Sequence, residues 1–132
     1  MIVVDTNVIA YLFIKGDHSE FAENLLKIDS EWLSTPLWRS EFRSILSLYI
    51  KKNKLTVMDV YNIVQIAEDF MTEREYQVDS DKVFHLVSSS NCSSYDCEFV
   101  SLAQSLKLTL YTSDKKIAQE FPNTAKLLKN IE

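Results

Sequence analysis

The segment Met1-Ile2-Val3-Val4-Asp5-Thr6-Asn7 decides the fold of this chain. Its apolar run Ile2-Val3-Val4 is short, rich in β-branched residues and ended by polar residues, which predicts a buried strand. The apolar segment at residues 8–13 predicts a helix directly after it. Ligands of open α/β sheets bind beyond the carboxyl ends of the strands. The sequence therefore places Asp5 at the floor of such a crevice.

Strands and helices alternate along the rest of the chain. Further strands are expected at residues 31–35, 75–79, 108–112 and 125–128, of which the second is weak and the last lies at an edge. Further helices are expected from Asp17 or Ser19 to 28, at 37–51, from Thr56 or Asp59 to 70, and at 80–88, 95–107 and 114–121. This alternation predicts a parallel sheet covered on both faces, in one domain over residues 1–132.

The composition limits the classes of protein to consider. The net charge of −5 argues against a protein that holds nucleic acid by bulk positive charge. It leaves open a nucleic-acid enzyme whose positive charge is a bound metal. The single glycine, Gly16, excludes a P-loop and a G-x-G-x-x-G turn, because each needs several glycines. Cys92 and Cys97 lack a histidine at metal-ligand spacing and are predicted to be reduced apolar residues.

Hydropathy indicates no membrane association. No apolar run approaches the roughly 20 residues of a membrane span. No signal-peptide pattern is present either, so we expect a cytoplasmic protein.

Four acids stand out by position. Asp5 follows the first predicted strand and Asp114 follows the strand at 108–112, so both come off strand carboxyl ends. Asp96 lies in the first turn of the helix that follows the serine-rich loop. Glu41 lies in the long third helix among apolar neighbours, where an unpaired carboxylate is costly.

Each acid also has a structural explanation. Asp5, or Thr6 in its place, and Asp114 have the positions of helix N-caps, and Asp96 has the spacing from Ser93 of a capping box. Taken singly, a cap is the simpler explanation for these three.

Glu41 has its own alternative, which is to lie at the edge of the apolar stripe and reach water, or to pair with Arg39 or Arg43. The conjunction of all four acids is what favours a functional site. Carboxylates gathered without basic partners repel one another unless cations neutralise them, and hard oxygen ligands favour Mg²⁺ or Mn²⁺. Such sites hydrolyse phosphodiesters by activating a water and stabilising the leaving oxygen.

Four short motifs give the chain a family resemblance. It resembles PIN-domain proteins of the kind found as the toxin in VapBC-type toxin–antitoxin pairs. The matching segments are Val3-Val4-Asp5-Thr6-Asn7, Ser40-Glu41, Tyr95-Asp96-Cys97 with Ala103 downstream, and Thr112-Ser113-Asp114.

The resemblance implies a three-layer α/β/α PIN-like domain with a mainly parallel sheet of four to five strands. It implies a Mg²⁺- or Mn²⁺-dependent endoribonuclease that hydrolyses RNA phosphodiester bonds, with catalytic and metal-binding acids at Asp5, Glu41, Asp96 and Asp114. Asn7 and Thr112 would orient these carboxylates. Toxins of this family usually form homodimers and are silenced by a small antitoxin that covers the acidic groove.

The chain departs from the family pattern at three places. Lys115 and Lys116 follow Asp114 where many relatives carry another acid, which leaves the number of metal ions open. Leu106-Lys107 stands where relatives often have glycine, and Cys97 replaces a commoner alanine. Lys116 keeps a second hypothesis in play, which is a catalytically weak PIN-fold module that binds RNA or protein.

Other residues point to no further chemistry. Asp5-Thr6-Asn7 lacks the second acid of an Asp-x-Asp phosphotransfer motif, and the serines at 88–94 lack a His/Asp arrangement. His18 and His85 receive no role as a general base. The lysines at 51, 52 and 54 are a solvated helix end, with RNA backbone contact as the weaker alternative. Core packing is expected for Trp32, Trp38 and Tyr49.

Overall fold

The computed structural model describes residues 1–130, and its centre is a parallel four-stranded sheet with the order β2-β1-β3-β4. The strands are β1 (Ile2–Val4), β2 (Trp32–Leu33), β3 (Leu110–Thr112) and β4 (Ala125–Leu127). Val3 of β1 lies opposite Leu33 of β2 and Leu110 of β3. The predicted parallel sheet is confirmed, with β1 at its centre and β4 at an edge.

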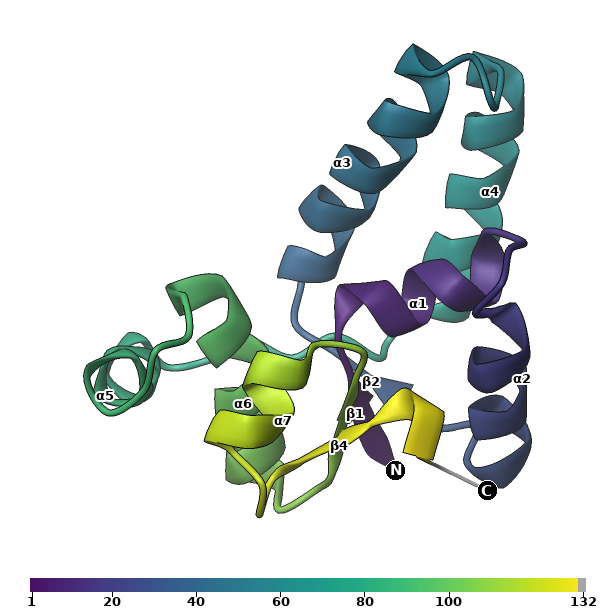
Figure 1. The fold of residues 1–132 in the computed structure, drawn as a ribbon. Helices are drawn as coiled ribbons and strands as arrows, with labels where there is room; N and C mark the ends of the chain where they lie inside the picture. Colours follow the sequence, from purple (N-terminus) through teal and green to yellow (C-terminus); the bar gives the residue numbers. More distant parts are fainter. Residues whose placement is uncertain (131–132) are drawn as a thin grey trace.

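Helices cover both faces of this sheet, so the three-layer α/β/α architecture is confirmed. Helices α1 and α2, which follow β1 in the chain, lie on one side of the sheet, and α6 and α7 lie on the other (Figure 1). The helices are α1 (Thr6–Phe13), α2 (Ser19–Ile28), α3 (Leu37–Lys51), α4 (Val57–Phe70), α5 (Ser80–Ser88), α6 (Ser94–Leu106) and α7 (Lys115–Glu120), followed by the 3₁₀ helix η1 (Leu128–Asn130).

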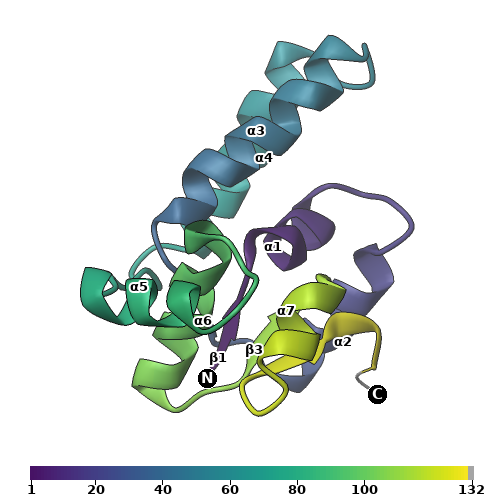
Figure 2. The ribbon, with the colours of Figure 1, turned by 60° about the vertical axis from the view of Figure 1, so that its left-hand side comes forward.

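Helices α3 and α4 pack side by side and form an arm that projects beyond the sheet (Figures 1 and 2). A capping box starts α4, because Thr56 accepts from the backbone of Asp59 and Asp59 accepts from the backbone of Thr56. At the base of the arm, the Arg39 guanidinium donates to Glu75 over 2.6 Å and 3.2 Å and lies 3.4 Å from Glu68. No helix within residues 1–130 has the length and apolar character to cross a membrane.

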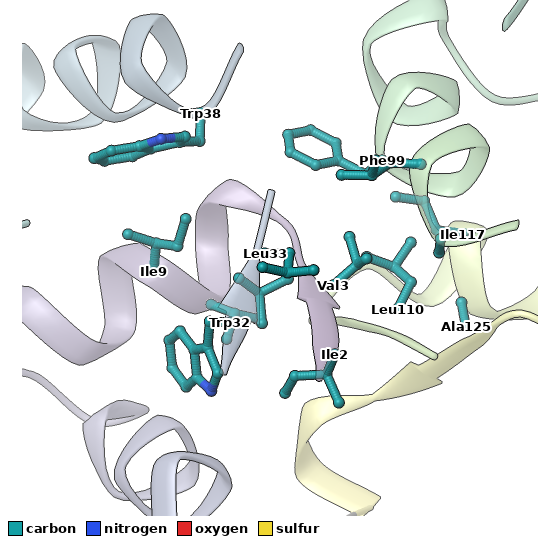
Figure 3. Packing of buried hydrophobic residues seen from close by; sticks show 14 of the residues in the cluster. Ile2, Val3, Ile9, Trp32, Leu33, Trp38, Phe99, Leu110, Ile117 and Ala125 are labelled. Carbon is teal, nitrogen blue, oxygen red and sulfur yellow. The ribbon is translucent and has the colours of Figure 1, made fainter. Parts of the chain in front are cut away.

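The apolar core lies on both sides of the central strands. Trp32 points toward α1 and α2, whereas Phe99 and Ile117 approach the sheet from α6 and α7 (Figure 3). Trp32 and Trp38 are fully buried, as expected, and Tyr49 is partly buried against the core. Both cysteines are free and buried, as the sequence predicted.

The strand predicted at Glu75–Asp79 is wrong. This segment meets the sheet only through one isolated bridge between Ser34 and Glu75. Two backbone hydrogen bonds of Ser34, with Arg74 and Tyr76, complete that contact. The Glu75 carboxylate accepts from the Trp38 indole N–H and from Arg39, so the segment is anchored by side chains of α3 and does not extend the sheet.

The predicted cap of α2 is also wrong. Neither Asp17 nor Ser19 is the N-cap, because His18 occupies that position without a capping hydrogen bond from its side chain. The Ser19 hydroxyl instead accepts from the Gly16 N–H over 3.0 Å and donates to the Ile14 carbonyl over 3.2 Å. Ser19 therefore ties the α1–α2 turn together, and the His18 ring packs between Tyr11 and Phe21.

Replacing Leu110 tests the core around the central strands. Leu110→Ala should lower the free energy of unfolding by roughly 2–5 kcal/mol, because Leu110 is fully buried between neighbouring strands and helices. Leu48→Ala is the matched control, since Leu48 is 54% exposed and should change stability by no more than about 0.5 kcal/mol. Urea unfolding measures both, and equal effects would contradict this core.

Candidate active site

The adjacent carboxyl ends of β1 and β3 open into a pocket of about 260 Å³. The chain leaves β1 into α1 on one face and leaves β3 into α7 on the other, which is where α/β sheets form their ligand crevice. All four acids singled out from the sequence line this pocket. Its described lining residues are Asp5, Thr6, Asn7, Glu41, Ser44, Ile45, Asp96, Phe99, Asp114 and Ile117.

Asp5 joins the two central strands at the floor of the pocket. It is 5% exposed and caps α1, since its Oδ1 accepts from the Val8 N–H over 3.2 Å. Its Oδ2 accepts from the Thr112 hydroxyl at the end of β3. The Thr112 oxygen in turn accepts from the Asp114 N–H over 2.9 Å. One chain of hydrogen bonds therefore positions Asp5 and Asp114 together.

Asp114 is a helix cap that also lines the pocket. Its Oδ1 accepts from the Lys116 N–H over 2.8 Å and from the Ile117 N–H over 3.3 Å at the start of α7. The Lys115 and Lys116 side chains are exposed, and neither lies among the described residues that line the acidic pocket. The backbone N–H groups of Lys116 and Ile117 therefore donate to the capping carboxylate of Asp114. The side chains of Lys115 and Lys116 do not line the pocket, so its wall remains acidic.

Glu41 reaches the pocket from α3 and is held by a threonine. The Thr6 hydroxyl donates to Glu41 Oε1 over 2.6 Å. Pairing with Arg39 is wrong, because that guanidinium binds Glu75 and Glu68. Arg43 is exposed, and no ion pair between it and Glu41 occurs in residues 1–130.

Asp96 enters from the first turn of α6. The Ser93 hydroxyl oxygen accepts from the Asp96 N–H over 3.1 Å, which is the N-cap half of the expected capping box. Two positions beyond it, Glu98 is partly buried. Burial raises the pKa of Glu98, the charge of Glu41 raises it further, and a hydrogen bond with Thr35 opposes both.

The sequence analysis missed Thr6 and Glu98 as neighbours of the acidic site. Thr6 adjoins Asp5, but only the bend from β1 into α1 turns its hydroxyl toward Glu41. Glu98 gave no signal of its own, because its proximity to Glu41 depends on how α3 and α6 pack. Asn7, which the family resemblance implied as a supporting residue, also lines the pocket.

The electrostatics of the pocket favour a cation. Burial raises the pKa of Asp5 from the ordinary 3.8 to about 7; the charges of Asp114 and Glu41 add to this, and the hydrogen bonds from Thr112 and Val8 oppose it. No lysine, arginine or histidine stands among the described residues that line the pocket. The four carboxylates therefore have no protein cation to neutralise them there.

These donors fit a divalent cation of the magnesium type. No three His, Cys, Asp or Glu side chains in the described part of the chain form a ready-made metal cage. Mg²⁺ does not require one, since it is usually bound by one or two carboxylates together with waters and substrate phosphates. Hard carboxylate oxygens at a water-accessible pocket are the donors that such an ion prefers.

Comparisons with known proteins agree with this architecture. The family model described as PIN domain matches residues 2–125. The crystal structure of PAE2754 from Pyrobaculum aerophilum is similar with a TM-score of 0.71 and 16% identity, over 96% of this chain and 90% of that one. The crystal structure of FitAcB from Neisseria gonorrhoeae is similar with a TM-score of 0.76 and 16% identity, over 99% of this chain and 100% of that one. No curated protein matches the chain in sequence.

The raised pKa of Asp5 predicts a specific pH dependence of stability. The folded state holds this proton more tightly than the unfolded chain, so without metal the stability should fall as pH rises from about 4 to about 7. Asp5→Asn removes this loss, which is at most roughly 4 kcal/mol.

Urea unfolding in EDTA across this pH range measures the effect. Asp69→Asn is the control, because Asp69 is an exposed residue of α4. It should keep the pH profile of the wild-type protein. Parallel profiles for the wild-type and Asp5→Asn proteins would contradict the assigned pKa.

Proposed function

Because this chain belongs to the PIN-domain family, whose members are generally nucleases, we propose that it is a Mg²⁺- or Mn²⁺-dependent endoribonuclease. The observation that carries the proposal is the pocket where four carboxylates meet without a basic lining residue. Such a pocket suits an enzyme that brings its positive charge as metal and binds a phosphodiester through it.

In this mechanism each acid has a defined task. Asp5, Asp96 and Asp114 would hold the metal, and the Thr112 hydroxyl keeps the Asp5 carboxylate oriented. When bound, the metal supplies the charge that binds the substrate phosphate and acidifies the attacking water. Glu41, whose Oε1 accepts from Thr6, would complete the metal site and would accept a hydrogen bond from the attacking water through Oε2. The water oxygen would bond to phosphorus as the bond to the leaving oxygen breaks, and the proton that the water loses would end on the leaving oxygen. Asn7 orients carboxylates from the rim.

We further propose that this protein is the cytoplasmic toxin of a toxin–antitoxin pair and that it forms a homodimer. Each subunit would consist of a single PIN-like nuclease domain over residues 1–132. Its sequence motifs support that role, and the described surface supports a protein partner. Several large apolar side chains of the α3–α4 arm are more than half exposed, and large exposed apolar patches mark interaction sites. They are Leu48, Val57, Met58, Tyr61 and Ile66.

A second candidate function is an RNA- or protein-binding module with a weak catalytic site. Two observations favour it, which are Lys115 and Lys116 in place of a further acid and the lack of a ready-made metal cage within residues 1–130. This module would bind its partner without metal-stimulated cleavage.

Cleavage of a labelled RNA pool by purified protein separates the two candidates. With Mg²⁺ or Mn²⁺ the wild-type protein should cut RNA, and EDTA should abolish cutting. Asp5→Asn should lower the rate at least about 100-fold, because it removes a charged ligand at the pocket floor. The rate of product formation on denaturing gels is the measurement.

Asp5→Asn protein, purified identically, controls for contaminating nuclease, and its circular dichroism spectrum checks its fold. Asp69→Asn is the matched substitution outside the site, because Asp69 is exposed on α4 and lies outside the pocket. It should cut at the wild-type rate. Equal cutting by the Asp5→Asn and wild-type proteins would refute the site, and RNA binding without cutting would favour the module.

A further inference from the structure

A second pocket, of about 250 Å³, lies beside the acidic one and has a different chemical character. It is formed by α1, the start of α2, the loop after β3 and η1, and these elements adjoin one another in Figure 2. Its lining includes three rings, Tyr11, His18 and Phe21, and two lysines, Lys115 and Lys129; the rest of the lining is Ser113, Leu127 and Leu128. We call it the aromatic–lysine pocket.

The three rings lie side by side and form one wall. The Tyr11 and His18 ring centroids are 4.8 Å apart with planes tilted by 39°, and those of His18 and Phe21 are 6.1 Å apart and stacked at 27°. His18 is exposed, whereas Tyr11 and Phe21 are partly buried against the core. The His18 side chain does not cap α2. Its ring instead contacts the rings of Tyr11 and Phe21.

A small intermediate pocket and one pair of consecutive residues connect the aromatic–lysine pocket with the acidic pocket. Asp114 lines the acidic pocket and the next residue, Lys115, lines the aromatic–lysine pocket. On the other side, Asn7 lines the acidic pocket and also a small pocket whose lining includes Tyr11 and His18. A strand held at the acids can therefore continue past this small pocket onto the rings.

From this juxtaposition we propose that the aromatic–lysine pocket binds an unpaired nucleotide of the RNA strand next to the one held at the acids. Its base packs on the wall of Tyr11, His18 and Phe21, and its phosphate binds Lys115 and Lys129. This subsite rests on the proposed function, because it takes its ligand from the same strand.

Charge and shape favour a single-stranded nucleotide. The lysines give this pocket a positive charge beside an acidic pocket in a chain with a net charge of −5, and a phosphate is the anion that a bound RNA strand brings there. Aromatic walls bind bases through their faces, which duplex RNA keeps stacked and covered. The subsite therefore selects unpaired RNA without reading its sequence.

Binding of a fluorescein-labelled single-stranded oligouridine, of about 12 nucleotides, tests the subsite. Fluorescence anisotropy gives the Kd in Mg²⁺, with phosphorothioate linkages in the oligomer to suppress cutting and with every variant made in otherwise wild-type protein. His18→Ala should raise the Kd about fivefold or more, since a stacked base contributes at least that factor. Lys129→Ala should raise the Kd and reduce the salt slope by about 1.

Two controls isolate stacking from general charge. Lys27→Ala removes an exposed lysine of α2 that lies outside the pocket and should leave the Kd within about twofold at moderate salt. An abasic oligomer of equal length should bind the protein with intact His18 more weakly than oligouridine does. His18→Ala should not change the Kd of the abasic oligomer. Circular dichroism of each variant confirms the fold.

The proposal would be overturned if His18→Ala and Lys129→Ala bound the oligomer with the same Kd as Lys27→Ala. That result would favour a protein segment as the ligand of the pocket. Failure of the subsite is distinguishable from failure of the proposed function. Wild-type cleavage with these unchanged affinities would reject the subsite alone. Weakened binding by both variants, in a protein that cuts no RNA, would support the subsite and reject the nuclease.

Discussion

The site depends on one buried carboxyl group, that of Asp5 where β1 ends. Its oxygens accept from Val8 at the start of α1 and from Thr112 at the end of β3, so the same group starts a helix and joins the central strands. Burial still raises its pKa to about 7, which means that two hydrogen bonds do not offset the loss of water. A nearby cation would remove this penalty, and the acids that share the pocket make a divalent ion the natural partner.

The structural and functional explanations of the acids are compatible. Asp5 and Asp114 cap α1 and α7 through backbone N–H groups, yet both line the acidic pocket. Capping fixes each carboxylate at the N-terminus of its helix, and the two helices leave the sheet on opposite faces. Because these helices start at the carboxyl ends of adjacent parallel strands, the two capping carboxylates lie on the wall of the same pocket. The fold therefore places acids together by the same contacts that start its helices.

Local patterns in the sequence predicted the parts of the structure that depend on local physics. The buried run at β1 and the long helix α3 follow from apolar spacing, and the four acids were found from their positions after strands and on helices. The strand expected at Glu75–Asp79 failed because Arg39 and Trp38, distant in sequence, anchor Glu75. The Thr6–Glu41 bond and the ring wall around His18 depend on helix packing, which periodicity does not encode.

Metal binding by the acidic pocket is the central claim, and calorimetric titration of the metal-free protein with Mn²⁺ tests it most directly, because it requires neither substrate nor partner. The account predicts saturable binding by the wild-type and Asp69→Asn proteins, and its loss in Asp5→Asn, whose substitution removes the buried charge at the pocket floor. Binding of equal affinity in the Asp5→Asn and wild-type proteins, or no binding by the folded wild-type protein, would contradict it.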